Sequence, residues 1–161
     1  WHTFRGMDTM ELSAKIVEIA RDKNPDTVFI DGGGVGGGVV DRCRQLGLDV
    51  IEINFGSKAT QRGYANLRAQ MWGNLKEAIL DGIRLPDNAD LITDLTGLEY
   101  GYNLRNDIQL ESKDHARKRG VASPDMADAL ALTYVLPVYP SRLGFTGTQQ
   151  ATTTEYDPFS G

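Results

Sequence analysis

Three carboxylates in this chain have the type and spacing to bind metal ions. Asp31 ends the apolar run Thr27-Val-Phe-Ile and is followed at once by a glycine-rich turn. Asp125 and Asp128 lie three residues apart in Ser-Pro-Asp-Met-Ala-Asp-Ala-Leu-Ala, so a helix that begins there presents both on one face. Carboxylates from a strand end and a helix start suit hard cations such as Mg²⁺ or Mn²⁺. The pattern predicts a two-metal site, the arrangement used in metal-assisted phosphodiester cleavage.

A basic segment lies directly before the paired carboxylates. It carries four positive side chains and one negative one, the positive ones being Lys113, Arg117, Lys118 and Arg119. Lys113 is placed to neutralise a phosphate or orient a water, and the whole run would give salt-sensitive, sequence-independent DNA binding. A solvated helix end is an equally open interpretation. The net charge of -5 argues against DNA binding over the whole surface, but it is compatible with one locally basic groove.

The glycine-rich turn at residues 32–38 permits a second interpretation. Gly32, Gly34 and Gly37 satisfy the G-x-G-x-x-G pattern of dinucleotide-binding proteins, and Glu52 follows at the distance of a ribose-binding acid. Against that site, Asp31 would place a negative charge beside the pyrophosphate, and the pattern predicts only two parallel strands. The alternatives are a metal ligand whose neighbouring glycines admit a metal or a DNA backbone, and a purely structural turn.

Hydrophobic periodicity and turn residues outline the elements that would position these side chains. A capping box of Asp8 and Glu11 predicts the first helix, and Ser123 with Pro124 predicts the start of the last one. A strand–helix–strand unit in between predicts two parallel strands in an α/β fold. The expected elements are helices over residues 9–22, 39–46, 64–80, 86–95 and 123–136, strands over 27–31 and 48–55, and a hairpin of 100–104 with 108–111.

Composition indicates an ordinary globular domain. The 161 residues are 40% hydrophobic and 24% charged, and no apolar run is long enough to span a bilayer. Cys43 is the only cysteine, which excludes an intrachain disulfide or a cysteine zinc site and fits a reducing compartment. We expect one domain over residues 1–137 and a flexible tail over 138–161, which is rich in Thr, Gln, Gly, Ser and Pro.

Taken together, the motifs resemble the C-terminal nuclease domain of tailed-phage terminase large subunits. The resemblance runs in order over about residues 4 to 136, and the last motif is also similar to RuvC-type resolvases. The matching stretches are Phe4–Asp8, Phe29–Arg42, Ile53–Gly56, Asn66–Trp72, Leu110–Lys113 and Arg119–Leu132.

The resemblance implies an RNase H-like mixed sheet flanked by helices. It implies a Mg²⁺- or Mn²⁺-dependent endonuclease that cuts concatemeric phage DNA in the host cytoplasm, with Asp31, Asp125 and Asp128 as its carboxylates. Implied partners are double-stranded DNA, an upstream ATPase motor domain, the portal or procapsid and the small terminase subunit, with no membrane.

One feature of the family has no counterpart in this sequence. The family's first metal-binding aspartate lies on the first strand of its sheet, and Asp8 fits a helix cap instead. We therefore expect that the opening strands of the sheet are missing and that this chain alone has weak or no nuclease activity. A noncatalytic DNA-binding or assembly module stays open as a further alternative.

Overall fold

The structure is a computed structural model that describes residues 2–140. The tail expected at residues 138–161 therefore lies almost wholly outside the described residues. Helices and strands are mixed, as the sequence predicted. In chain order they are α1 (Thr9–Lys23), β1 (Phe29–Asp31), α2 (Gly36–Gln45), β2 (Ile51–Ile53), α3 (Leu67–Leu80), α4 (Ala89–Gly97), β3 (Tyr100–Tyr102), β4 (Ile108–Leu110), α5 (Lys113–Lys118) and α6 (Asp125–Leu132).

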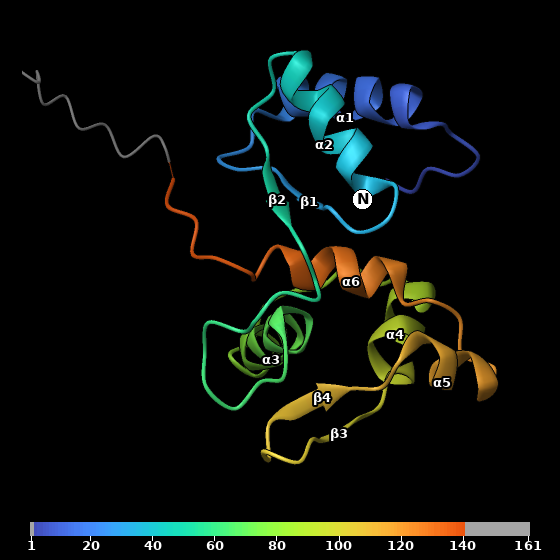
Figure 1. Cartoon of the computed structure of the whole chain (residues 1–161). Coiled ribbons are helices and arrows are strands. Elements are labelled where there is room, and N and C mark those ends of the chain that lie inside the picture. The colour runs from blue at the N-terminus through green and yellow to red at the C-terminus, as the bar shows by residue number, and fades with distance from the viewer. Residues whose placement is uncertain (1, 141–161) are drawn as a thin grey trace, which may run out of the picture.

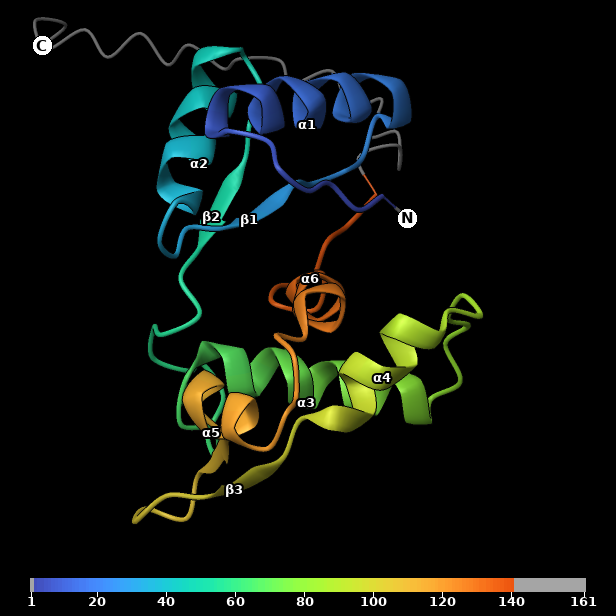
Figure 2. The ribbon, with the colours of Figure 1, turned by 90° about the vertical axis from the view of Figure 1, so that its right-hand side faces the viewer.

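The elements form layers around the β1–β2 pair. The two strands are parallel, as predicted, and Asp31 pairs with Ile53 in the register. Figures 1 and 2 both show α1 and α2 over one face of the pair and α6 beneath the other, with α3, α4, α5 and the β3–β4 hairpin farther out. The hairpin is antiparallel and matches its predicted position.

A separate hydrophobic cluster fills the space on each face of the strand pair. The cluster toward α1 and α2 contains Val17, Val39, Val40, Cys43 and Val50, with Ile30 packed against it. The cluster toward α3 and α6 contains Ile53, Met71, Leu75, Ala131, Leu132 and Val135, with Phe29 packed against it. Because side chains alternate along a strand, Asp31 points to the same face as Phe29, which is the side of α6.

Several predicted boundaries change for physical reasons. The helix expected at 39–46 begins instead at Gly36, so the last glycines of the glycine-rich segment form its first helical turn. The helix expected at 64–80 begins after Asn66, whose side chain accepts the Ala69 amide. The last helix ends at Leu132 instead of residue 136. The strand β1 is half-buried at each of its three residues.

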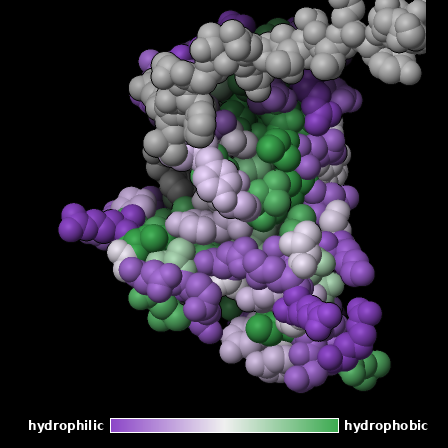
Figure 3. Space-filling model, turned by 90° about the vertical axis from the view of Figure 1, so that its left-hand side faces the viewer, coloured by the Kyte–Doolittle hydropathy of each residue, from purple (hydrophilic) through white to green (hydrophobic). Residues whose placement is uncertain are grey.

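The first helix confirms its predicted start. Asp8 accepts the amides of Met10 and Glu11, and Glu11 accepts the Asp8 amide in return. Surface polarity is uneven on the side shown in Figure 3, where hydrophobic side chains gather in the upper middle and hydrophilic ones cover most of the rest. Within residues 2–140 no helix has the length and apolar character needed to span a membrane.

Candidate metal and nucleic-acid site

Asp31 ends β1 and is held by the turn that follows it. Its Oδ1 accepts the Gly33 amide at 3.0 Å, and the Gly32 amide donates to the Ile53 carbonyl at 2.8 Å. At Gly36 a Cβ atom would lie 1.8 Å from the Asp31 carbonyl oxygen, so only glycine lets α2 begin this close to the strand. The turn thus fixes the backbone of Asp31 and leaves its half-buried carboxylate facing the side of α6.

Asp125 is the first residue of α6 and is exposed. Its Oδ1 accepts the Ser123 hydroxyl at 2.6 Å. Asp125 lines an open groove of about 750 Å³ together with Asp90 and Asp94 from α4 and with Arg5. Its carboxylate is therefore accessible to an ion or ligand that approaches from this groove.

The predicted cap of the last helix is wrong in detail. Ser123 donates to Asp125 and does not cap the helix, and the residue before the helix is Pro124. The amide donors of Met126 and Ala127 are met instead by the Asp94 carboxylate, at 2.9 and 3.4 Å. A side chain from α4 thus satisfies the helix start, which local sequence does not reveal.

Asp128 lies one turn farther along α6, and its surroundings differ from those of Asp125. It is 6% exposed and receives two hydrogen bonds from Arg68, Nε to Oδ1 at 2.8 Å and Nη2 to Oδ2 at 2.9 Å. The Trp72 indole donates a third, at 2.9 Å to Oδ1. A carboxylate has about four acceptor positions, so three are already occupied by α3 side chains.

The structure brings together the elements that the metal hypothesis requires. Helix α6 packs against β1, and Asp31 points to the side of α6. The three carboxylates do not form one closed cluster, because no group of three or more His, Cys, Asp or Glu side chains within residues 2–140 is arranged to hold a metal ion. Mg²⁺ commonly binds through one or two carboxylates, several waters and a substrate phosphate. The hard oxygen donors of Asp31 and Asp125 fit that chemistry.

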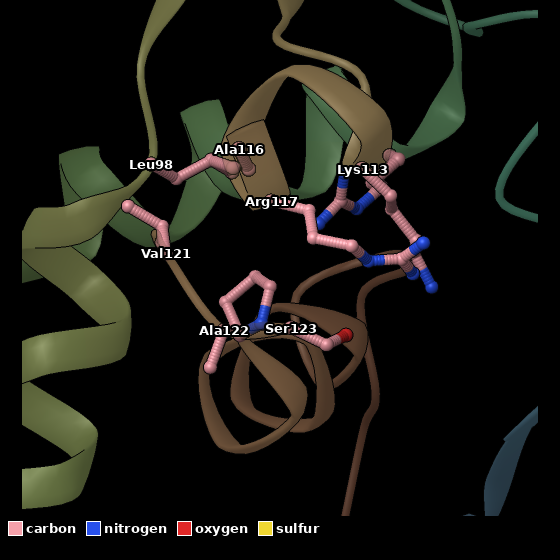
Figure 4. A pocket seen from close by; sticks show the side chains of 9 residues that line it. Leu98, Lys113, Ala116, Arg117, Val121, Ala122 and Ser123 are labelled. Atoms are coloured by element: carbon pink, nitrogen blue, oxygen red, sulfur yellow. The ribbon is translucent and has the colours of Figure 1, made fainter. Parts of the chain in front are cut away.

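Cationic side chains converge on a second pocket beside the start of α6. Figure 4 shows this basic pocket, which we define by Arg68, Lys113 and Arg117. Its volume is about 240 Å³, and Ala122, Ser123 and Pro124 form its wall on the side of α6. Lys113 and Arg117 come from α5, which Ser112 caps. The short turn at residues 122–123 also lines the open groove of Asp90, Asp94 and Asp125, so cations and carboxylates lie on either side of this turn.

The other two predicted DNA-binding residues occupy different places. Lys118 is exposed at the end of α5 and does not line the basic pocket. Arg119 forms an ion pair with Glu111, and its Nη1 atom lies 3.1 Å from Glu99 Oε1. Its Nη2 atom also donates to the Gly97 carbonyl at 2.9 Å. The Arg119 hydrogen bond is the main cause that lowers the pKa of Glu111, and the same bond raises the pKa of Arg119. Arg119 therefore joins α5 to the hairpin and the end of α4.

The glycine turn does not resemble an open dinucleotide site. The Glu52 carboxylate lies directly against Gly32, where an added Cβ would meet its Oε1 at 2.3 Å. The Gly33 amide, a donor that a phosphate would need, is taken by Asp31. Within the described residues the parallel sheet has only the strands β1 and β2. These observations count against the dinucleotide alternative.

Sequence reasoning missed three residues of this region. Arg68 and Trp72 contact Asp128, and Asp94 meets the amides at the start of α6. Arg68 and Trp72 are four apart on one helix, a spacing that places them on one face and could have marked them as partners of one group. Asp94 carries no such signal, because its contact with α6 depends on how α4 packs.

The comparisons with known proteins bear on the fold. Neither a protein-family model nor a curated protein sequence matches this chain. A lysine-to-alanine variant of the large terminase subunit of bacteriophage Sf6, with calcium, matches with a TM-score of 0.66 at 20% identity, over 82% of this chain and 74% of that one. The nuclease domain of the same subunit with manganese gives 0.64 at 20%, over 83% and 76%.

A third structure of that Sf6 nuclease domain gives a TM-score of 0.63 at 22% identity, over 82% of this chain and 74% of that one. At sequence identities of 20–22%, these matches show a shared fold and nothing finer. The resemblance noted from the motifs is confirmed at that level, and this chain has the RNase H-like fold of phage terminase nuclease domains.

Proposed function

We propose that this chain is a metal-dependent DNA endonuclease domain that acts in phage genome packaging. The observation that carries the proposal is the arrangement at residues 122–125. There the exposed Asp125 carboxylate, the basic pocket and the face of β1 that presents Asp31 belong to neighbouring elements of a terminase nuclease fold. Metal-assisted cleavage of a phosphodiester uses a carboxylate that binds the cation and positive charge that holds the phosphate.

We propose Asp31 and Asp125 as the residues that hold Mg²⁺ or Mn²⁺. Structures of the similar Sf6 domains include manganese or calcium, which supports a divalent ion as the cofactor. A bound ion would activate the attacking water and stabilise the leaving oxygen. Asp128, the third predicted ligand, has most of its acceptor positions occupied by Arg68 and Trp72.

The protein's own side chains would position the DNA strand. Lys113 and Arg117 would hold a phosphate in the basic pocket, next to the turn that leads into Asp125. Lys118, exposed one residue farther, would contact a neighbouring phosphate. Contacts of this kind read the backbone and not the bases, so binding would weaken steeply with salt.

Nicking of supercoiled plasmid tests the proposal directly. The assay compares the wild-type chain with Asp31→Asn and with Asp41→Asn, an exposed aspartate on α2 as a matched control. Each is also assayed within the native protein that contains these residues, with Mn²⁺ or EDTA. We expect Asp31→Asn to lower nicking about a hundredfold or more, comparable to the loss of one group that stabilises transition-state charge. Unchanged nicking by Asp31→Asn would remove this residue from the mechanism.

A noncatalytic DNA-binding or assembly module is the second candidate. The basic pocket favours it, since phosphate binding requires no metal. Binding of duplex DNA without cleavage, in every form of the protein and with Mn²⁺ present, would support it. The motor domain, the portal or procapsid, the small terminase subunit and the host cytoplasm remain proposals that follow from the family.

A further inference from the structure

The Arg68–Asp128–Trp72 cluster is the feature that the proposed function does not use. Arg68 and Trp72 project from α3, and Asp128 projects from the first turns of α6. The ion pair is shielded, since the side chains of Arg68 and Asp128 are 11% and 9% exposed. Its two parallel hydrogen bonds fix the orientation of the carboxylate as well as its position.

The cluster sets where α6 lies against its neighbours. Asp128 is three residues after Asp125, so the two share a helical face, and fixing one carboxylate fixes the turn that carries the other. The Trp72 indole adds a second contact from the next turn of α3. Thus α3, through Asp128, helps to fix the rotation of α6 about its own axis.

Arg68 also borders the basic pocket. Its Nε and Nη2 atoms serve Asp128, which leaves Nη1 for the pocket that Lys113 and Arg117 line. One side chain therefore contacts both the helix of the candidate metal ligand and the candidate phosphate site. A shift of Arg68 would move these two sites relative to each other.

We propose that Arg68 is a positioning residue, which acts through Asp128 to hold Asp125 and the basic pocket in the relative arrangement that cleavage requires. This inference rests on the proposed function. In it Asp128 receives Arg68 and Trp72 instead of a metal ion. Its carboxylate contributes to the reaction only through the placement of α6.

A double-mutant cycle separates this role from the alternatives. The variants are Asp128→Asn, Arg68→Gln and the double variant, whose two amides can still form a neutral hydrogen bond. Glu18→Gln, in a surface pair with Lys15, is the control. Mn²⁺ binding is measured by titration and nicking by kcat and KM, at a temperature where melting curves in EDTA show each variant to be folded.

We expect Asp128→Asn to keep the wild-type Mn²⁺ stoichiometry, to lower kcat about tenfold or more, and to regain part of that loss when Arg68→Gln is added. Loss of Mn²⁺ binding in folded Asp128→Asn would overturn the inference and make Asp128 a ligand. An unchanged kcat in all folded variants would also overturn it, since the pair would then serve stability alone. If the native protein that contains these residues neither binds Mn²⁺ nor nicks DNA, the proposed function is overturned, and this role with it.

Discussion

The two faces of the β1–β2 pair are packed by different kinds of side chains. The face toward α1 and α2 rests on small apolar side chains, with Val40 and Cys43 fully buried. The face toward α3 and α6 adds a shielded ion pair to its hydrophobic cluster. Burying charge is costly, and an apolar replacement often serves stability as well or better. The difference therefore suggests that the α3–α6 face keeps its charges for the site beside them, and the α1–α2 face acts as support.

Removing one partner of the buried pair gives the largest expected effect. Arg68→Ala leaves Asp128 charged and shielded from water, and we expect a loss of about 3–5 kcal/mol in the free energy of unfolding. Urea denaturation at neutral pH in EDTA measures it. The double change Arg68→Met with Asp128→Leu is the matched control, and it should recover most of the loss. A single variant as stable as wild type would show that the ion pair does not form.

The glycine that begins α2 against the end of β1 gives the next effect. In Gly36→Ala the new methyl group would overlap the Asp31 carbonyl oxygen, so the start of α2 must move away from β1. We expect a loss of about 1–3 kcal/mol from the forced shift, together with reduced nicking because Asp31 moves. Gly37→Ala is the matched control, because a Cβ atom there would make only an ordinary van der Waals contact. Gly47→Ala is unsuitable, because Gly47 has a φ of +80° and any side chain there would be strained. Equal behaviour of Gly36→Ala and Gly37→Ala would contradict this role of Gly36.

The supporting face should affect stability without affecting chemistry. Val40→Ala removes two buried methyl groups from the cluster toward α1 and α2, which should cost about 1–3 kcal/mol in the free energy of unfolding. Nicking and Mn²⁺ binding, measured well below the melting temperature, should equal those of wild type. If Val40→Ala lowers kcat as much as Asp128→Asn does, the proposal that one face supports the fold and the other serves the chemistry is wrong.

Local sequence signals predicted much of this molecule. The capping box at Asp8 and the parallel pairing of β1 with β2 follow from patterns within one segment or one strand–helix–strand unit. The packing of α6 against β1 was expected only because both segments carry carboxylates suited to one metal site. The partners of Asp128 did not follow, because Arg68 lies sixty residues away and only the packing of α3 on α6 brings them together. The predicted cap Ser123 failed for the same reason, since Asp94 reaches the helix start from α4.

The ion pair of Glu111 with Arg119, whose side chain is 38% exposed, offers the smallest effect and can be compared with the shielded Arg68–Asp128 pair. The Arg119 hydrogen bond lowers the pKa of Glu111 in the folded protein. A lowered folded pKa means that the stabilisation is present above the unfolded value, about 4.3, and is lost as the pH falls through the folded pKa. Melting temperatures of wild type and Glu111→Gln should thus differ slightly at pH 7 and converge on acidification.

High salt should shrink the difference at pH 7, because exposed pairs are screened. The penalty of Arg68→Ala should persist in the same salt, since the Arg68–Asp128 pair is shielded from water. Equal salt sensitivity of the two would mean that the Arg68–Asp128 pair is not shielded from solvent ions, and the special role of that pair would lose its electrostatic basis.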